Sequence, residues 1–231
     1  ALRKVQRAVC HGGGGPNNDH LSHVRLMLIT FLFAGIQVAW AMQIANASPL
    51  FIQLGVSRSV TGNIWTVGPL SGLVVQPLVG VWSDSCRSRL GRRRPFLIAG
   101  ALIACVAMLL LAYCEPLGRL LGDTATERPV AIAFALIAFC AMDFSLNTVQ
   151  GPCRALLIDV APRSQQQVGN AWFAFMQGGG NVTGYLLGAL PLASWLSFLF
   201  ESNAEALFTI AVIIVVASLV ATVLGAKERR L

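Results

Sequence analysis

Six apolar stretches, each close to the length of a bilayer-spanning helix, constrain this chain more than any other feature of its sequence. A hydrocarbon core of roughly 30 Å needs about 20 mainly apolar residues per helix. Charged or Pro/Gly-rich segments separate the stretches, so each is predicted to form one helix that crosses the membrane. The approximate spans are 24–46, 60–82, 96–113, 130–157, 168–190 and 206–226. The sequence therefore predicts an all-α membrane protein with six transmembrane helices.

The composition favours a lipid bilayer as the surrounding medium. Hydrophobic residues make up 55% of the chain and charged residues 12%, a balance that a water-soluble domain does not need. The formal net charge of +7 raises the alternative of nucleic-acid binding. No basic stripe is interleaved with exposed aromatic residues, as such binding would require, so nucleic acid is not an expected partner. The six cysteines form no CxxC pair, and neither a metal site nor a disulfide framework is predicted.

Basic residues are distributed unevenly between the loops, and this predicts the orientation of the helices. Lys and Arg are retained on the cytoplasmic side of short loops. With the amino terminus inside, thirteen of the 17 basic residues fall in inner segments and three in outer loops. We therefore predict a cytoplasmic tail over residues 1–23, a transmembrane bundle over 24–226 and a cytoplasmic end over 227–231.

Glycines spaced four residues apart predict close packing between helices. Small residues allow helix backbones to approach each other in lipid, where no hydrophobic force acts between helices. The second span has Gly68 and Gly72, and the fifth has Gly180, Gly184 and Gly188. The general abundance of glycine in membrane helices accounts well for the first pair and poorly for the second set.

A polar stripe in the fourth span is the main candidate for a functional site. This span contains both Asp143 and Arg154, although each ionised group costs a few kcal/mol or more inside a membrane. At about 100° per residue, Asn147, Gln150 and Arg154 all lie within about 40° of the carboxylate around the helix, so the four share one face. A buried ion pair that only fixes helix packing is the alternative. The two amides on the same stripe favour the lining of a cavity.

Asp143 is the candidate proton-coupling residue. Burial favours its neutral form, whereas water or a nearby cation favours its ionised form, so its charge can depend on conformation. Arg154 stays charged, and its fork of donors suits sugar hydroxyls or a salt bridge to Asp143. In the first span Gln37 and Trp40 place an amide beside an aromatic ring, a mixture that binds sugars. The predicted substrate-binding residues are Arg154, Asn147, Gln37, Trp40 and Gln150.

Residues 80–95, GVWSDSCRSRLGRRRP, resemble the cytoplasmic signature of the major facilitator superfamily. In that signature a glycine is followed four residues later by an acid, and then by a second glycine with basic residues. The spacer before Gly91 is longer than in most of the superfamily and is similar to that of sucrose/proton symporters of the glycoside-pentoside-hexuronide group. The stretches GIQVAWAMQ, SPLFIQLGV and MDFSLNTVQGPCRALLIDV are similar to the same group. The matches cover nearly all of residues 25–190.

The resemblance implies the N-terminal half of a major facilitator fold, which has two six-helix halves around a central site. It implies proton-coupled symport of sucrose or a related disaccharide or glucoside, with Asp143 in proton coupling and Arg154 in transport. The ligands would be the sugar and H+, no cofactor is expected, and a missing C-terminal half or a second copy would complete the cavity. We expect a fragment of a longer protein and a plasma-membrane rather than a vacuolar location. The family commonly has a histidine where this chain has Arg58, which leaves the sugar open.

The same resemblance implies a charge cluster at the cytoplasmic end that stabilises the outward-facing state. The arginines of this loop could instead act only in setting the topology, and both roles can hold together. The predicted conformational-gating residues are Asp84, Gly80, Gly91, Arg92, Arg93 and Asp159.

Two other classes of function compete with symport. A non-transporting membrane sensor or partner subunit could keep the same fold. A membrane enzyme is not predicted, because His11, His20 and His23 all lie in the tail and no metal or nucleophile constellation is present.

Overall fold

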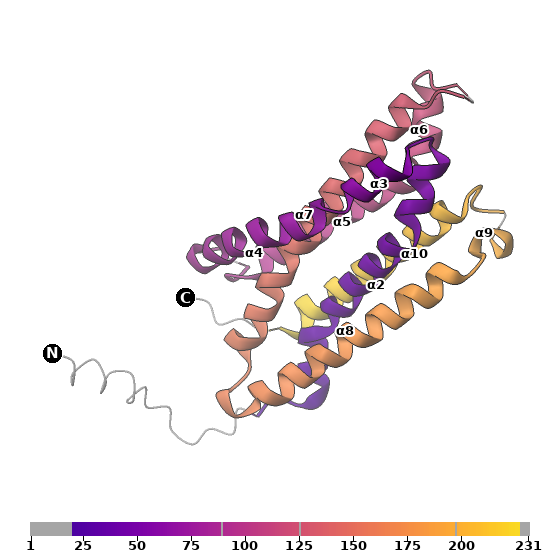
Figure 1. The fold of residues 1–231 in the computed structure, drawn as a ribbon. Coiled ribbons are helices and arrows are strands. Elements are labelled where there is room, and N and C mark those ends of the chain that lie inside the picture. The colour runs from indigo at the N-terminus through magenta and orange to yellow at the C-terminus, as the bar shows by residue number, and fades with distance from the viewer. Residues whose placement is uncertain (1–19, 89, 125, 197, 227–231) are drawn as a thin grey trace.

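The computed structural model describes residues 20–88, 90–124, 126–196 and 198–226, which are almost entirely helical (Figure 1). Most of the predicted tail and the predicted end at 227–231 lie outside the described residues. The helices are α2 (His23–Gln53), α3 (Arg58–Ile64), α4 (Val67–Ser85), α5 (Arg94–Ala112), α6 (Cys114–Leu120), α7 (Pro129–Val160), η1 (Arg163–Gln165), α8 (Gln166–Ala189), α9 (Leu192–Trp195) and α10 (Asn203–Gly225).

Five segments of the described chain are long and apolar enough to cross a membrane. These segments are His23–Gln53, Arg58–Ser85, Arg94–Ala112, Pro129–Val160 and Asn203–Gly225, and they coincide with five of the predicted spans. The remaining predicted span, 168–190, coincides with α8, which has 24 residues. Its Gln, Asn and Gly residues lower its hydropathy, so membrane crossing by α8 stays a prediction.

Two of the predicted spans differ from the helices in their detail. The first continues beyond the predicted end at residue 46, because α2 runs on to Gln53 with Pro49 inside it. The second is interrupted, since Trp65 and Thr66 form a turn between α3 and α4. Pro69 has no backbone N–H to donate to the carbonyl of Trp65, and the loss of that helical bond accounts for the break.

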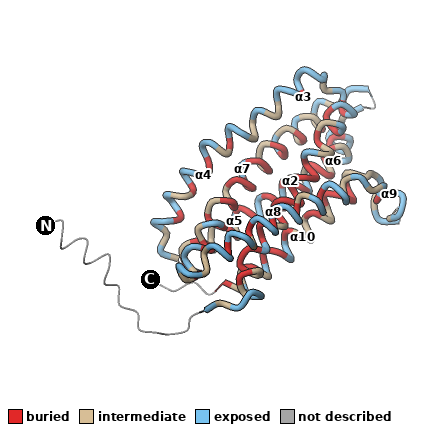
Figure 2. Tube along the Cα trace, turned by 60° about the horizontal axis from the view of Figure 1, so that its bottom comes forward, coloured by how far each residue is buried: buried red, intermediate tan, exposed pale blue. Residues whose placement is uncertain are grey.

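The helices form two groups, which Figure 1 separates. α7 packs against α5 and α4, and α2 packs against α8 and α10; contacts of α2 with α7 and of α10 with α5 join the groups. Buried residues follow α2, α7 and α10, while α3 and α4 are largely exposed (Figure 2). Within the most apolar window of each span, 61% of α2 is buried but only 11% of Arg58–Ser85. α2 is therefore central and α4 lies at an edge.

The helix ends that were predicted to be cytoplasmic lie together at one end of the bundle. The Arg25 side chain at the start of α2 donates to the carbonyl of Gly225 at the end of α10, with a distance of 3.3 Å. Gln165, just before α8, exchanges hydrogen bonds of 2.7 and 2.9 Å with the backbone of Leu21. α8 therefore begins at the end of the bundle where α2 begins and α10 ends, and it runs between the same two ends as these helices (Figure 1).

The glycines of α8 bring its backbone against α2. A Cβ atom on Gly180 would lie 2.5 Å from the carbonyl oxygen of Ala34, and one on Gly184 would lie 2.6 Å from the Cβ of Ala41. Real Cβ contacts are longer, so only glycine permits this approach. The close packing predicted from the glycines of the fifth span is therefore confirmed.

We expect Gly184→Leu to destabilise the bundle by about 1–3 kcal/mol, the usual cost of overpacking a close contact. The matched control is Gly178→Leu on the same helix, because a Cβ there meets nothing within 4 Å. Thermal unfolding of the purified protein in detergent, followed by loss of the monodisperse peak, measures both. Equal unfolding temperatures for the two variants would contradict the packing role of Gly184.

Candidate functional site

A cavity of about 640 Å³ lies between α2, α4 and α7. Its lining combines two tryptophans, two amides, one carboxylate and two glycines with apolar and hydroxyl groups. The lining residues are Trp40, Ile44, Ser48, Trp65, Gly68, Pro69, Gly72, Gln76, Asp143 and Asn147. An aromatic and amide lining of this kind can hold a polar ligand the size of a small saccharide.

Asp143 is almost fully buried at the wall of this cavity, with 1% of its surface exposed. Its Oδ1 accepts a hydrogen bond of 3.2 Å from the Nε2 of Gln43 on α2. Its Oδ2 is buried without a hydrogen-bond partner, as is the Oε1 of Gln43. Within the described chain no basic side chain forms an ion pair with Asp143, so the buried carboxyl group depends on a neutral donor.

Asn147 ties α4 to α7 beside this carboxyl group. Its Nδ2 donates to the Oγ of Ser71 and to the carbonyl of Asp143, both at 2.9 Å. Its Oδ1 accepts a hydrogen bond of 2.8 Å from the Nε2 of Gln76. A Cβ on Gly72 would lie 3.3 Å from the same Oδ1, so glycine leaves room for this network.

The other predicted substrate residues lie outside the cavity. Gln37 is 6% exposed and faces α8, where a Cβ on Gly180 would lie 2.8 Å from its own Cβ. Gln150 is 7% exposed, and its Nε2 is buried without a partner. Arg154 is exposed and lies about 16 Å along α7 from the carboxylate, at roughly 1.5 Å per residue. The polar stripe of α7 is therefore divided between the cavity and its surroundings.

Arg154 lies over aromatic rings rather than beside an acid. Its Cζ is 5.4 Å from the ring centroid of Phe33 on α2 and 6.0 Å from that of Phe173 on α8. A cation within about 6 Å of a ring face is attracted by its quadrupole. No carboxylate among the described residues pairs with Arg154, so the salt bridge to Asp143 considered from the sequence is not formed.

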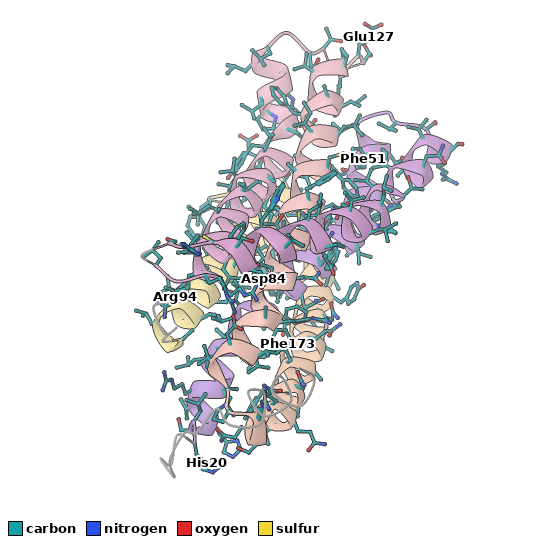
Figure 3. The ribbon with its side chains drawn as sticks, turned by 90° about the vertical axis from the view of Figure 1, so that its left-hand side faces the viewer. His20, Phe51, Asp84, Arg94, Glu127 and Phe173 are labelled. Carbon is teal, nitrogen blue, oxygen red and sulfur yellow. The ribbon has the colours of Figure 1, made fainter. Side chains whose placement is uncertain are left out.

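A second polar network joins the ends of α4, α5 and α7. Arg93 is 6% exposed; it forms an ion pair with Asp84, donates to Ser83 at 2.5 Å and pairs with Asp159 at 3.0 Å. Arg92 also pairs with Asp159, at 2.8 Å. Figure 3 labels Asp84 in this region, away from the end that carries Glu127. The four predicted charges are thus brought together.

The two glycines of this region behave differently. Gly91 has a φ of 108°, a conformation that residues with a side chain rarely adopt, and it allows the chain to turn before α5. A Cβ on Gly80 would meet nothing within 4 Å, so the packing does not explain this glycine.

Sequence reasoning missed several residues of the cavity. Trp65 donates to the Oγ of Ser48 at 2.9 Å and packs against Phe139 with ring centroids 5.2 Å apart. Gln43, the donor to Asp143, was not among the predicted site residues either. The four-residue spacing of Gly68, Gly72 and Gln76 was a signal that one face of α4 meets a polar partner.

Long apolar helices, five of which could each cross a bilayer among the described residues, define the chain as an integral membrane protein that crosses the bilayer several times. The described residues hold no cluster of His, Cys, Asp or Glu that could bind a metal ion. The family model of the Major Facilitator Superfamily matches residues 26–230, and the chain belongs to this family of membrane transporters. It is not an enzyme.

Sucrose transport proteins of plants are among the relatives of the chain. SUT4 of Oryza sativa subsp. indica is 39% identical over 235 residues, which are 94% of this chain and 39% of the relative. SUC3 of Arabidopsis thaliana is 37% identical over 227 residues, 91% and 38% respectively. SUT3 of Oryza sativa subsp. japonica is 35% identical over 235 residues, 94% and 46%. The chain thus spans less than half the length of these relatives. Their similarity to the chain confirms the family resemblance that its motifs predicted.

We expect Asn147→Leu to destabilise the protein by about 2 kcal/mol, because three hydrogen bonds of roughly 0.6 kcal/mol each are lost within the membrane. Thr148→Val is the control, since Thr148 is only half-buried and its hydroxyl donates within its own helix, to the carbonyl of Phe144 at 2.8 Å. Thermal unfolding in detergent measures the difference. A loss no larger than that of the control would mean that Asn147 does not hold α4 to α7.

Proposed function

We propose that this chain supplies the N-terminal half of a proton-coupled symporter for sucrose or a related disaccharide or glucoside. The observation that carries the proposal is Asp143, a buried carboxyl group with one unpartnered oxygen at the wall of a cavity with two tryptophans. The plant relatives of the chain are named as sucrose transport proteins, and this supports a sugar as the substrate.

Protonation of Asp143 is the proposed coupling step. The carboxylate accepts a hydrogen bond from the neutral amide of Gln43, no described basic side chain pairs with it, and buried charge without a counter-ion is costly. A proton on Oδ2 removes that charge and provides a hydrogen-bond donor at an oxygen that now has no partner. The neutral cavity then accepts the sugar against Trp40, with Trp65 as a second aromatic surface.

Arg154, Gln37 and Gln150 belong to the proposed binding site although they do not line the present cavity. Arg154 has no acid as partner among the described residues, and Gln150 keeps an unused donor, so both side chains have hydrogen-bonding capacity for a ligand. A C-terminal half or a second copy facing these helices would complete the wall around the sugar.

The network around Arg93 is the proposed cytoplasmic gate. It ties α4, α5 and α7 together at the end predicted to face the cytoplasm, while the cavity lies nearer the other end, beside Ser48 and Trp65. This combination fits the outward-facing state. In this orientation both termini are cytoplasmic, and the plasma membrane is the proposed location.

We expect Asp143→Asn to abolish the dependence of sugar uptake on outside pH, because the amide cannot exchange a proton. Uptake of labelled sucrose by the full-length transporter, at acidic and neutral outside pH, measures this ratio. Glu127→Gln is the control. Glu127 is an exposed carboxylate in the loop between α6 and α7, and the variant should keep the wild-type ratio. Unchanged coupling in Asp143→Asn would overturn the proposed role, and absence of sugar uptake by the wild type would overturn the proposed function.

We expect Arg93→Gln to lower the uptake rate by about tenfold, the factor that corresponds to ~1.4 kcal/mol of lost preference for one state. Arg87→Gln removes the same charge from the same loop and is the control, because Arg87 forms no ion pair with any described residue. Initial rates of uptake at equal surface expression measure both. Equal rates in the two variants would mean that these arginines act only in topology.

A further inference from the structure

The contact of Arg154 with two phenyl rings joins three helices. Phe33 is fully buried and Phe173 is 7% exposed, and their ring centroids lie 4.5 Å apart. The guanidinium on α7 lies over both rings, while the residue as a whole stays exposed. The cation therefore lies against aromatic carbon on one side, and no described carboxylate pairs with its N–H donors.

The ring contact compensates the charge of Arg154 without using its N–H donors, which an ion pair would use. A cation in a spanning helix needs compensation, and a carboxylate partner would provide it but would also occupy the donors in a bidentate bond. A ring face compensates charge without accepting those hydrogen bonds. Two rings from different helices also restrict the long side chain to one position.

We infer that Phe33 and Phe173 are positioning residues that hold the guanidinium of Arg154 by cation–π contact, with its donors presented to the substrate. The expected consequence, tighter binding of a polyhydroxylated ligand, rests on the proposed function. The ring contacts also explain why Arg154 is not drawn into an ion pair. The rings act through Arg154 and need not touch the sugar.

The test replaces Phe173, and separately Phe33, with phenylalanines that carry one, two and three fluorine atoms, in the full-length transporter. Each fluorine withdraws electron density from the ring face while the ring keeps nearly the same size, so the attraction for a cation falls stepwise. We expect the KM for sugar uptake to rise with each fluorine, severalfold over the series, with little change in the maximal rate. Phe173→Trp should keep a low KM, and Phe173→Leu should raise it.

Phe208 is the matched control, because it is fully buried on α10 and makes no cation–π contact within the described chain. Fluorination there should leave KM unchanged. A flat KM across the Phe33 and Phe173 series would overturn the inference and reduce the two rings to packing groups.

A second measurement separates this inference from the proposed function. If the wild type takes up no sugar, the function fails, but the unfolding temperature of each fluorinated protein still reports the contact. We expect this temperature to fall along the series when Arg154 is present and to stay level in an Arg154→Met background. Equal trends in both backgrounds would overturn the cation–π contact itself.

Discussion

The cost of an unsatisfied polar group in lipid is the constraint on which the rest of this structure depends. Backbone groups meet it by forming helices, and α2 even continues through Pro49. Side chains meet it by pairing, as Asn147 does with Ser71 and Gln76. Because most buried polar side chains of the described chain are paired, an unpaired oxygen at a cavity wall, such as the Oδ2 of Asp143, stands out as a candidate for binding a proton or a ligand.

These exceptions divide the polar residues into two kinds. Arg93 and Asn147 have hydrogen-bonding partners on neighbouring helices, and they fasten α4 and α5 to α7. Asp143 keeps one buried oxygen free, and Arg154 lies on rings instead of on an acid. The first kind gives the bundle its shape, and the second kind has capacity left for binding. Both kinds look alike in a sequence, and only contacts distinguish them.

Much of the fold followed from the sequence, because membrane helices are recognisable by their length and hydropathy. The close packing of α8 followed too, since glycines four residues apart at 180 and 184 leave one side of a helix open to a neighbouring backbone; that this neighbour is α2 did not follow. The break at Trp65 did not, because it depends on a proline four residues later in a segment that reads as continuous. The partner of Asp143 could not be chosen either, since helical periodicity places polar residues on a face but not against a particular neighbour.

The division of the helices into two groups gives the charge of Asp143 a structural consequence. α4 and α7 are fastened at two levels: through Asn147 near the cavity, and through Arg93, which pairs with Asp84 on α4 and with Asp159, about 18 Å further along α7 at roughly 1.5 Å per residue. Among the described residues, the side-chain hydrogen bond between α2 and α7 is that of Gln43 with Asp143. A bond to an ionised acceptor is about twice as strong as a neutral one. In the proposed coupling step, protonation of Asp143 would therefore weaken this one hydrogen bond between α2 and α7, while the hydrogen bonds that fasten α4 to α7 stay unchanged.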